Sequence, residues 1–168
     1  MGLDNRIVLK IHNCTPKIKE ALKSAIDSHS YNMYFEDLRS HSDESGDYKT
    51  LDLCYWREWW GLRNILVYKL NGGSLDYSEP KYTLNKSDLV YVRDLLVKCI
   101  IDPEELDGYT SGHWEFNECY DQVMFQIIRL SWVIKVLFGH DNYGLTEEEV
   151  EFRNLIAGKW EIYFYDSY

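Results

Sequence analysis

Tryptophan and arginine gather in one short segment of this sequence. Residues 55–63 read Tyr-Trp-Arg-Glu-Trp-Trp-Gly-Leu-Arg and hold three tryptophans and two arginines. Indole rings offer faces for stacking and cation–π contacts, and guanidinium groups offer paired donors for carboxylates and phosphates. Both residue types also dominate the energetics of protein interfaces. The segment is therefore the strongest candidate for a binding site, and six residues are predicted to form it: Tyr55, Trp56, Arg57, Trp59, Trp60 and Arg63.

Helical spacing decides whether these side chains could act together. If a helix begins at Trp56, then Trp56, Trp59 and Trp60 share one side of it with Arg63. The alternative is that the tryptophans fill the core and the arginines pair with neighbouring acidic residues. The sequence leaves both readings open.

The sequence shows no assembled catalytic or metal-binding set. No two of the five histidines are three or four residues apart, the spacing that would place two ligands on one helix face. No metal or cofactor is therefore expected. Ser111-Gly112-His113 is the nearest approach to a nucleophile turn, but it lacks the G-x-S-x-G pattern. One catalytic hypothesis stays open, an acid–base hydrolase that uses His113 and a nearby carboxylate.

Charge and cysteine content exclude several classes of protein. The formal net charge is −10, which argues against binding of a nucleic-acid backbone and against docking on an anionic membrane. No apolar stretch is long and uninterrupted enough to span a bilayer. The four cysteines form no C-x-x-C pair, which is typical of reduced thiols in a cytoplasmic protein. The acidic run over 102–121 is either a solvated face or a functional patch.

Four stretches are predicted to be strands, because they are short and rich in β-branched and aromatic residues. They cover residues 6–11, 51–55, 82–84 and 160–165. In the second stretch, alternation predicts that Tyr55 shares a face with Leu51 and Leu53.

Capping residues and apolar periodicity predict the helices that surround these strands. Each predicted helix begins at a Thr or Asn cap, except the second. That helix begins at a tryptophan, where the spacing of the apolar residues changes from that of a strand to that of a helix. The starts are Thr15-Pro16, Trp56, Asn85 with Asp88, Asn117, and Thr146 with Glu149 in a capping box. A strand over 62–70 competes with the second of these helices.

The order of these elements predicts the fold class. Strands at both chain termini, with helices between them, do not give a regular βαβ alternation. We expect a single α+β domain over 1–168, with a small antiparallel sheet covered on one face by about four to five helices. The polar stretch near 40–48 is expected to be a mobile insertion loop.

Short motifs along the chain resemble those of a known family. They are the opening Met1-Gly2-Leu3-Asp4, the Tyr55-Trp56-Arg57 run and the aromatic ending Trp160-Glu161-Ile162-Tyr163-Phe164-Tyr165. Together they resemble a family of small uncharacterised bacteriophage and prophage proteins, in which a Lys usually stands where this chain has Glu58. The resemblance implies an accessory protein made in the cytoplasm of a host cell, and it supplies no catalytic residues.

Three hypotheses for function follow. The leading one is a non-catalytic phage-type accessory protein that binds and modulates a host protein through an acidic, aromatic-rich surface, as in host takeover or anti-defence. The second is a protein that binds or sequesters a nucleotide, with Trp56, Arg57, Trp60 and Arg63 around the ligand. The third is the acid–base hydrolase.

Overall fold

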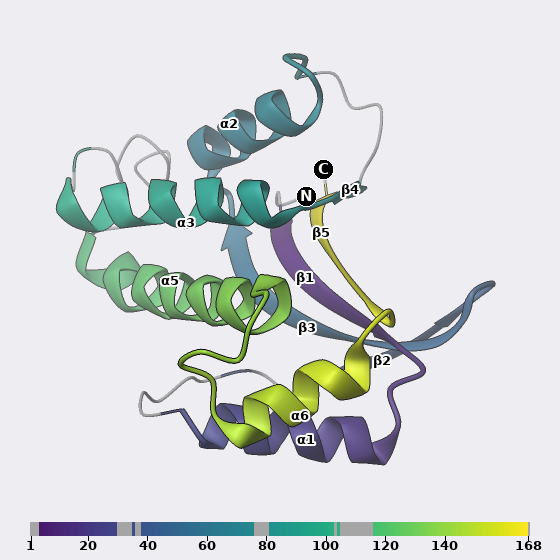
Figure 1. The fold of residues 1–168 in the computed structure, drawn as a ribbon. Coiled ribbons are helices and arrows are strands. Elements are labelled where there is room, and N and C mark those ends of the chain that lie inside the picture. The colour runs from purple at the N-terminus through teal and green to yellow at the C-terminus, as the bar shows by residue number, and fades with distance from the viewer. Residues whose placement is uncertain are drawn as a thin grey trace.

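A five-stranded antiparallel sheet organises the protein, as the computed structural model shows (Figure 1). The structure describes residues 4–29, 38–75, 81–102 and 116–167, together with Phe35 and Glu104. The strand order is β2-β3-β1-β5-β4, and every neighbouring pair is antiparallel. The strands are β1 (Asp4–His12), β2 (Arg39–Asp43), β3 (Gly46–Arg57), β4 (Lys81–Thr83) and β5 (Trp160–Ser167).

Five helices complete the described fold and confirm the α+β class. They are α1 (Pro16–Asp27), α2 (Trp60–Leu70), α3 (Lys86–Ile101), α5 (Phe116–Phe138) and α6 (Glu147–Ile156). In Figure 1, α2, α3 and α5 lie across the sheet and α1 lies beside α6. No helix within the described residues has the length and apolar character needed to cross a membrane.

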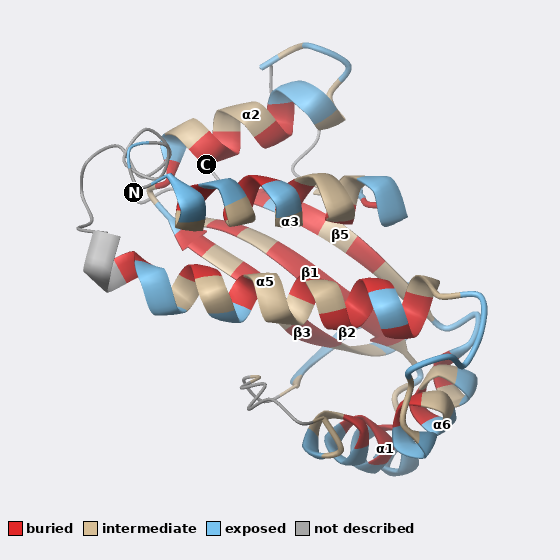
Figure 2. Ribbon diagram, turned by 60° about the vertical axis from the view of Figure 1, so that its left-hand side comes forward, coloured by how far each residue is buried: buried red, intermediate tan, exposed pale blue. Residues whose placement is uncertain are grey.

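The core lies between these helices and one face of the sheet. Alternate residues of the central strand β1, namely Ile7, Leu9 and Ile11, are completely buried in it (Figure 2). The same cluster includes Trp132 of α5 and Phe152 of α6, whose rings stack with centroids 6.1 Å apart. The intervening residues of β1 point to the opposite face, because side chains alternate along a strand.

Local capping signals predicted three helix starts correctly. Thr15 Oγ1 accepts a hydrogen bond from the backbone N–H of Ile18, and Pro16 occupies the first turn of α1. Asn85 with Asp88 and Thr146 with Glu149 form complete capping boxes. Each of these signals depends only on residues within one helical turn.

The predicted loop near 40–48 is wrong, because this stretch forms the β2–β3 hairpin. His41 pairs with Tyr48 and Arg39 pairs with Thr50, on either side of a turn at 44–45. All five residues of β2 are exposed, so its polar sequence is that of a solvated edge strand.

The predicted helix start at Trp56 is also wrong. Strand β3 continues to Arg57, and Glu58 then adopts a positive φ of 61°, which ends the strand. Helix α2 follows from Trp60, so the helical reading of 62–70 is confirmed over the strand alternative. The longest helix begins at Phe116, so the prediction that Asn117 caps it is wrong as well.

A β-bulge changes which residues of β3 face the core. Ile7 pairs with Cys54 and Val8 pairs with Asp52, so Leu53 is an extra residue in the strand. Leu53 and Cys54 are both completely buried, and the alternation reverses after them. Tyr55 therefore lies on the face opposite to Leu53, contrary to the prediction from simple alternation.

Candidate functional site on the open face of the sheet

The six residues predicted as a site do not meet on one exposed surface. Trp56 and Trp59 are each 1% exposed, and Trp56 Nε1 donates a hydrogen bond of 2.8 Å to Gln126 Oε1. Arg63 is 4% exposed and forms an ion pair of 2.8 Å with the completely buried carboxylate of Asp166. For these three residues the alternative is confirmed, because both tryptophans lie in the core and the arginine pairs with an acidic residue inside the fold.

The other three predicted residues reach the surface at different places. Trp60 is 36% exposed at the start of α2, and Arg57 is exposed at the end of β3. Tyr55 lies half-buried beside Arg6, its cross-strand partner on β1. Of the six, Tyr55 is the residue that leads to a different candidate site.

That site lies on the second face of the sheet, which we call the open face. It is formed by the β1 residues that alternate with the core positions, and by their neighbours across the sheet. The pairing places these residues in successive rows: Tyr55, Arg6, Tyr165 and Lys81; Asp52, Val8, Tyr163 and Thr83; Arg39, Thr50, Lys10 and Glu161; His41, Tyr48 and His12. Tyrosine and cationic side chains thus predominate on the open face.

One hollow, which we call the arginine hollow, is lined by residues of this face together with one residue of α5, and it has a volume of about 280 Å³. Its lining consists of Arg6, Arg39, Asp52, Tyr55 and Arg129. Asp52 Oδ2 lies 2.7 Å from Arg6 Nη1 and 3.2 Å from Arg39 Nη2, so one carboxylate oxygen serves two guanidinium groups. The Arg6 guanidinium also lies 4.7 Å from the centre of the Tyr55 ring. The third arginine, Arg129, comes from α5.

A second hollow of about 180 Å³, the tyrosine hollow, shares Arg6, Arg39 and Asp52 with the first. Its other lining residues are Val8, His41, Thr50, Tyr163 and Tyr165, and all eight come from strands. The two hollows therefore adjoin one another across the Arg6–Asp52–Arg39 cluster. Taken together, the two volumes fall at the lower end of the range of about 300–1,000 Å³ that is typical of small-molecule sites.

Two of the tyrosines beside these hollows, Tyr163 and Tyr55, have a raised pKa. Burial, with the nearby Tyr48 and Asp52 as further causes, raises the pKa of Tyr163 to about 12. Burial also raises the pKa of Tyr55, as does the hydrogen bond of 2.9 Å that its hydroxyl donates to Asp4. The Tyr163 ring also has the Lys81 ammonium 4.0 Å from its centre. A phenol whose pKa is raised keeps its proton throughout the neutral pH range, so the Tyr163 hydroxyl remains a hydrogen-bond donor there, while the Tyr55 hydroxyl already donates to Asp4.

Acidic residues on the open face are shared between cations. Glu161 lies 3.3 Å from Lys81 and 3.9 Å from Lys10, while Lys10 also lies 3.5 Å from Asp43. Asp52 is shared by two arginines in the same way. This arrangement contrasts with the net charge of −10 of the whole chain, and it favours an anion as the ligand.

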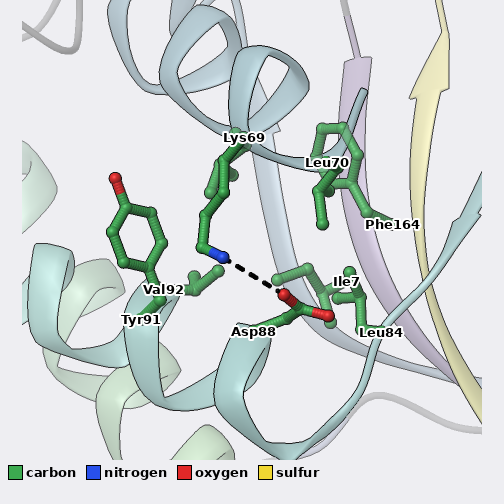
Figure 3. A pocket seen from close by; sticks show the side chains of 9 residues that line it. Ile7, Lys69, Leu70, Leu84, Asp88, Tyr91, Val92 and Phe164 are labelled. Carbon is green, nitrogen blue, oxygen red and sulfur yellow. Dashed lines mark hydrogen bonds and ion pairs between the residues drawn. The ribbon is translucent and has the colours of Figure 1, made fainter. Parts of the chain in front are cut away.

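Two further hollows do not offer a comparable site. The crevice between α2 and α3 is lined by apolar residues beneath the Lys69–Asp88 ion pair, and it leaves no room for a water molecule (Figure 3). A wider depression of about 470 Å³ beside the β2–β3 hairpin includes Cys14 and Lys49. Burial raises the pKa of the Cys14 thiol, so this thiol is not an activated nucleophile.

Two predicted features, the Ser111–His113 segment and the acidic run, fall wholly or largely outside the described residues. Ser111, His113 and most of the acidic run over 102–121 lie outside the described residues. Within the described residues, no group of three or more His, Cys, Asp or Glu is arranged to hold a metal ion. The hydrolase hypothesis and the acidic-patch hypothesis therefore stay predictions.

The arginine and tyrosine hollows were not predicted from the sequence, although one signal pointed toward them. Apolar residues alternate with three others in the C-terminal strand: Glu161, Tyr163 and Tyr165. This alternation predicts that the three side chains share one face of the sheet, directed away from the core. Arg39 and Arg129 carry no such signal, because one lies in the stretch predicted as a loop and the other in a long helix.

Fold and site together define an α+β protein with an open, tyrosine- and arginine-lined sheet face. No protein-family model, curated protein or solved structure matches this chain. The two hollows are therefore the features of the molecule that indicate a ligand.

Proposed function

We propose that this protein is a non-catalytic, phage-type accessory protein that binds a small anionic ligand in the arginine hollow. The observation that carries the proposal is the lining of that hollow, in which the guanidinium groups of Arg6 and Arg39 share the Asp52 carboxylate and a third arginine, Arg129, lines the same space. Guanidinium groups bind carboxylates and phosphates through paired N–H donors. The ligand class is thus the one expected from the nucleotide hypothesis, but the binding residues are different.

Two of the guanidinium groups that line the hollow are accessible to solvent. Each guanidinium carries five N–H donors in a planar fork that matches a carboxylate or phosphate. The Arg39 side chain is about half exposed and that of Arg6 is about one quarter exposed, so solvent and small ions reach both. Asp52 Oδ2 contacts both Arg6 and Arg39. An incoming dianion would therefore compete with the Asp52 carboxylate for the N–H donors of these two arginines.

Binding without turnover is proposed because the hollows hold no activated nucleophile. The nearest arrangement is the contact of 2.8 Å between His41 Nε2 and Thr50 Oγ1. Thr50 is only 5% exposed, so its hydroxyl can form a hydrogen bond at the wall of the hollow but has too little access to attack a bound substrate. Prolonged incubation with p-nitrophenyl phosphate is expected to release no phosphate.

Thermal unfolding with inorganic phosphate and pyrophosphate tests the proposal. A ligand at a hundredfold excess over its dissociation constant stabilises the native state by about 2.7 kcal/mol. We expect Arg39→Ala to weaken this stabilisation, with a loss of at least about tenfold in affinity, or about 1.4 kcal/mol. Arg39 is the suitable position because its side chain is exposed and its removal leaves the core intact.

Arg93→Ala is the matched control. Arg93 is also a surface arginine with one aspartate partner, Asp94 at 2.9 Å, but it lies on α3 away from the open face. It should respond to phosphate as the wild type does. Equal responses of the two variants, or equal stabilisation by sodium chloride at the same ionic strength, would refute an anion site at the arginine hollow.

A second candidate function is the binding of a host protein, and the composition of the open face favours it. Tyr48, Tyr55, Tyr163 and Tyr165 lie there with arginines, the residue types that dominate interface hot spots. We expect a Tyr165→Asp variant to lose a host protein that the wild type captures, while Tyr143→Asp, changed at a 91% exposed tyrosine, keeps it. Capture that survives Tyr165→Asp unchanged would exclude the open face as the contact surface.

A further inference from the structure

The tyrosine hollow extends the arginine hollow in a direction that an isolated phosphate would not fill. The two hollows share Arg6, Arg39 and Asp52, so a ligand bound to those arginines has direct access to the second hollow. The second hollow adds about 180 Å³. A ligand that uses both must have an anionic part and a second part of different chemistry.

The residues of the tyrosine hollow indicate what that second part is. Val8, which is only 4% exposed, lies between Asp52 on β3 and Tyr163 on β5 in the sheet register. Tyr165, two residues further along β5, is 40% exposed and is the most exposed of the four open-face tyrosines. A hollow with an aliphatic residue at its centre and tyrosine rings at its side suits a flat ring, because aromatic faces stack on one another.

Polar groups at the other side of the hollow suit a ring with a hydrogen-bonding edge. His41 and Thr50 lie there, joined by the contact of 2.8 Å between Nε2 and Oγ1. The imidazole is further fixed by stacking on Tyr48, with ring centroids 5.1 Å apart and an interplanar angle of 14°. A hydroxyl and an imidazole held in this way can each donate or accept one further hydrogen bond.

We infer that the ligand is a nucleotide, with its phosphate at the arginine hollow and its base in the tyrosine hollow. The base lies over Val8 and stacks on Tyr165, and its polar edge faces His41 and Thr50. Tyr163 is the less suitable stacking partner, because the Lys81 ammonium already lies against its ring. The inference rests on the proposed function, since it assigns the ring-binding part of the same site.

Calorimetric titration of the whole protein separates the two parts of the ligand. Adenosine, guanosine, cytidine and uridine monophosphates are compared with ribose 5-phosphate, which carries the same phosphate and sugar without a base. Stacking of one base on an aromatic side chain contributes enough to shift affinity by about tenfold or more. We therefore expect at least one nucleoside monophosphate to bind about tenfold more tightly than ribose 5-phosphate.

Tyr165→Ala tests the assigned stacking partner. It should remove the tenfold advantage of the nucleotide and leave the affinity for ribose 5-phosphate unchanged, while Tyr143→Ala changes neither. If ribose 5-phosphate binds as tightly as every nucleotide, or if Tyr165→Ala weakens both ligands equally, the ring site is refuted and the anion site stands. If none of these phosphates binds, both proposals fail.

Discussion

Replacement of Arg63 by alanine is expected to lower the free energy of unfolding by about 3–5 kcal/mol, because it leaves a buried charge without its partner. Arg63 Nη2 donates to Asp166 Oδ2 at 2.8 Å, and Nε donates to Oδ1 at 3.2 Å. Asn5 Nδ2 donates to the same Oδ1 at 2.6 Å. The carboxylate thus joins α2 to β1 and β5, and it has no access to solvent.

A loss of that size is a large part of the stability of a single domain, which is about 5–15 kcal/mol. Urea unfolding followed by tryptophan fluorescence measures it. Arg93→Ala, which breaks a partly exposed pair on α3, should cost no more than about 1 kcal/mol. A similar small loss for Arg63→Ala would contradict the buried pair.

The double variant Arg63→Met with Asp166→Leu distinguishes an unpaired charge from a loss of packing. Replacement of a buried ion pair by apolar residues of similar volume is often neutral or stabilising. We therefore expect the double variant to be more stable than Arg63→Ala alone. If the double variant is instead the less stable of the two, loss of shape or of the buried hydrogen bond from Asn5 to Asp166, not loss of charge balance, explains the effect.

The parts of the fold that the sequence predicted are those set by neighbouring residues. The Thr146–Glu149 capping box requires only four consecutive residues, and its geometry is the one expected: Thr146 Oγ1 accepts from the backbone N–H of Glu149 at 3.1 Å. The outward alternation of β5 is equally local. An antiparallel sheet with a strand at each end of the chain was predicted from the order of the elements, because that order gives no regular βαβ alternation.

The parts that the sequence missed depend on contacts between distant residues. Nothing in the polar stretch of β2 signals a strand, because its pairing with β3 supplies the stabilisation. Trp56 is spaced from Trp59 and Trp60 as residues on one helix face are. It lies in a strand nevertheless, because β3 pairs with β1 and Trp56 is the partner of Asn5. The arginine hollow draws its guanidinium groups from β1, β2 and α5, so no single segment of sequence could have revealed it.

Two single-residue deletions in β3 are expected to have opposite outcomes, because only one of them removes the extra residue of the bulge. Deletion of Leu53 leaves Asp52, Cys54 and Tyr55 in regular alternation, so each side chain keeps its present face. We expect this variant to fold, with a loss of about 2–5 kcal/mol for a buried leucine side chain.

Deletion of Thr50 removes a residue from the regular part of the same strand, where no partner on β1 or β2 is spare. One side of β3 must then shift by one residue, which turns its core side chains toward solvent. We expect this variant to lose near-ultraviolet circular dichroism and cooperative thermal unfolding.

Each deletion shortens β3 by one residue, so chain length is controlled. Because the bulge keeps Asp52 and Tyr55 on one face, the Leu53 deletion should also retain stabilisation by phosphate. Cooperative unfolding of the Thr50 deletion, or complete loss of structure in the Leu53 deletion, would contradict the role assigned to the bulge.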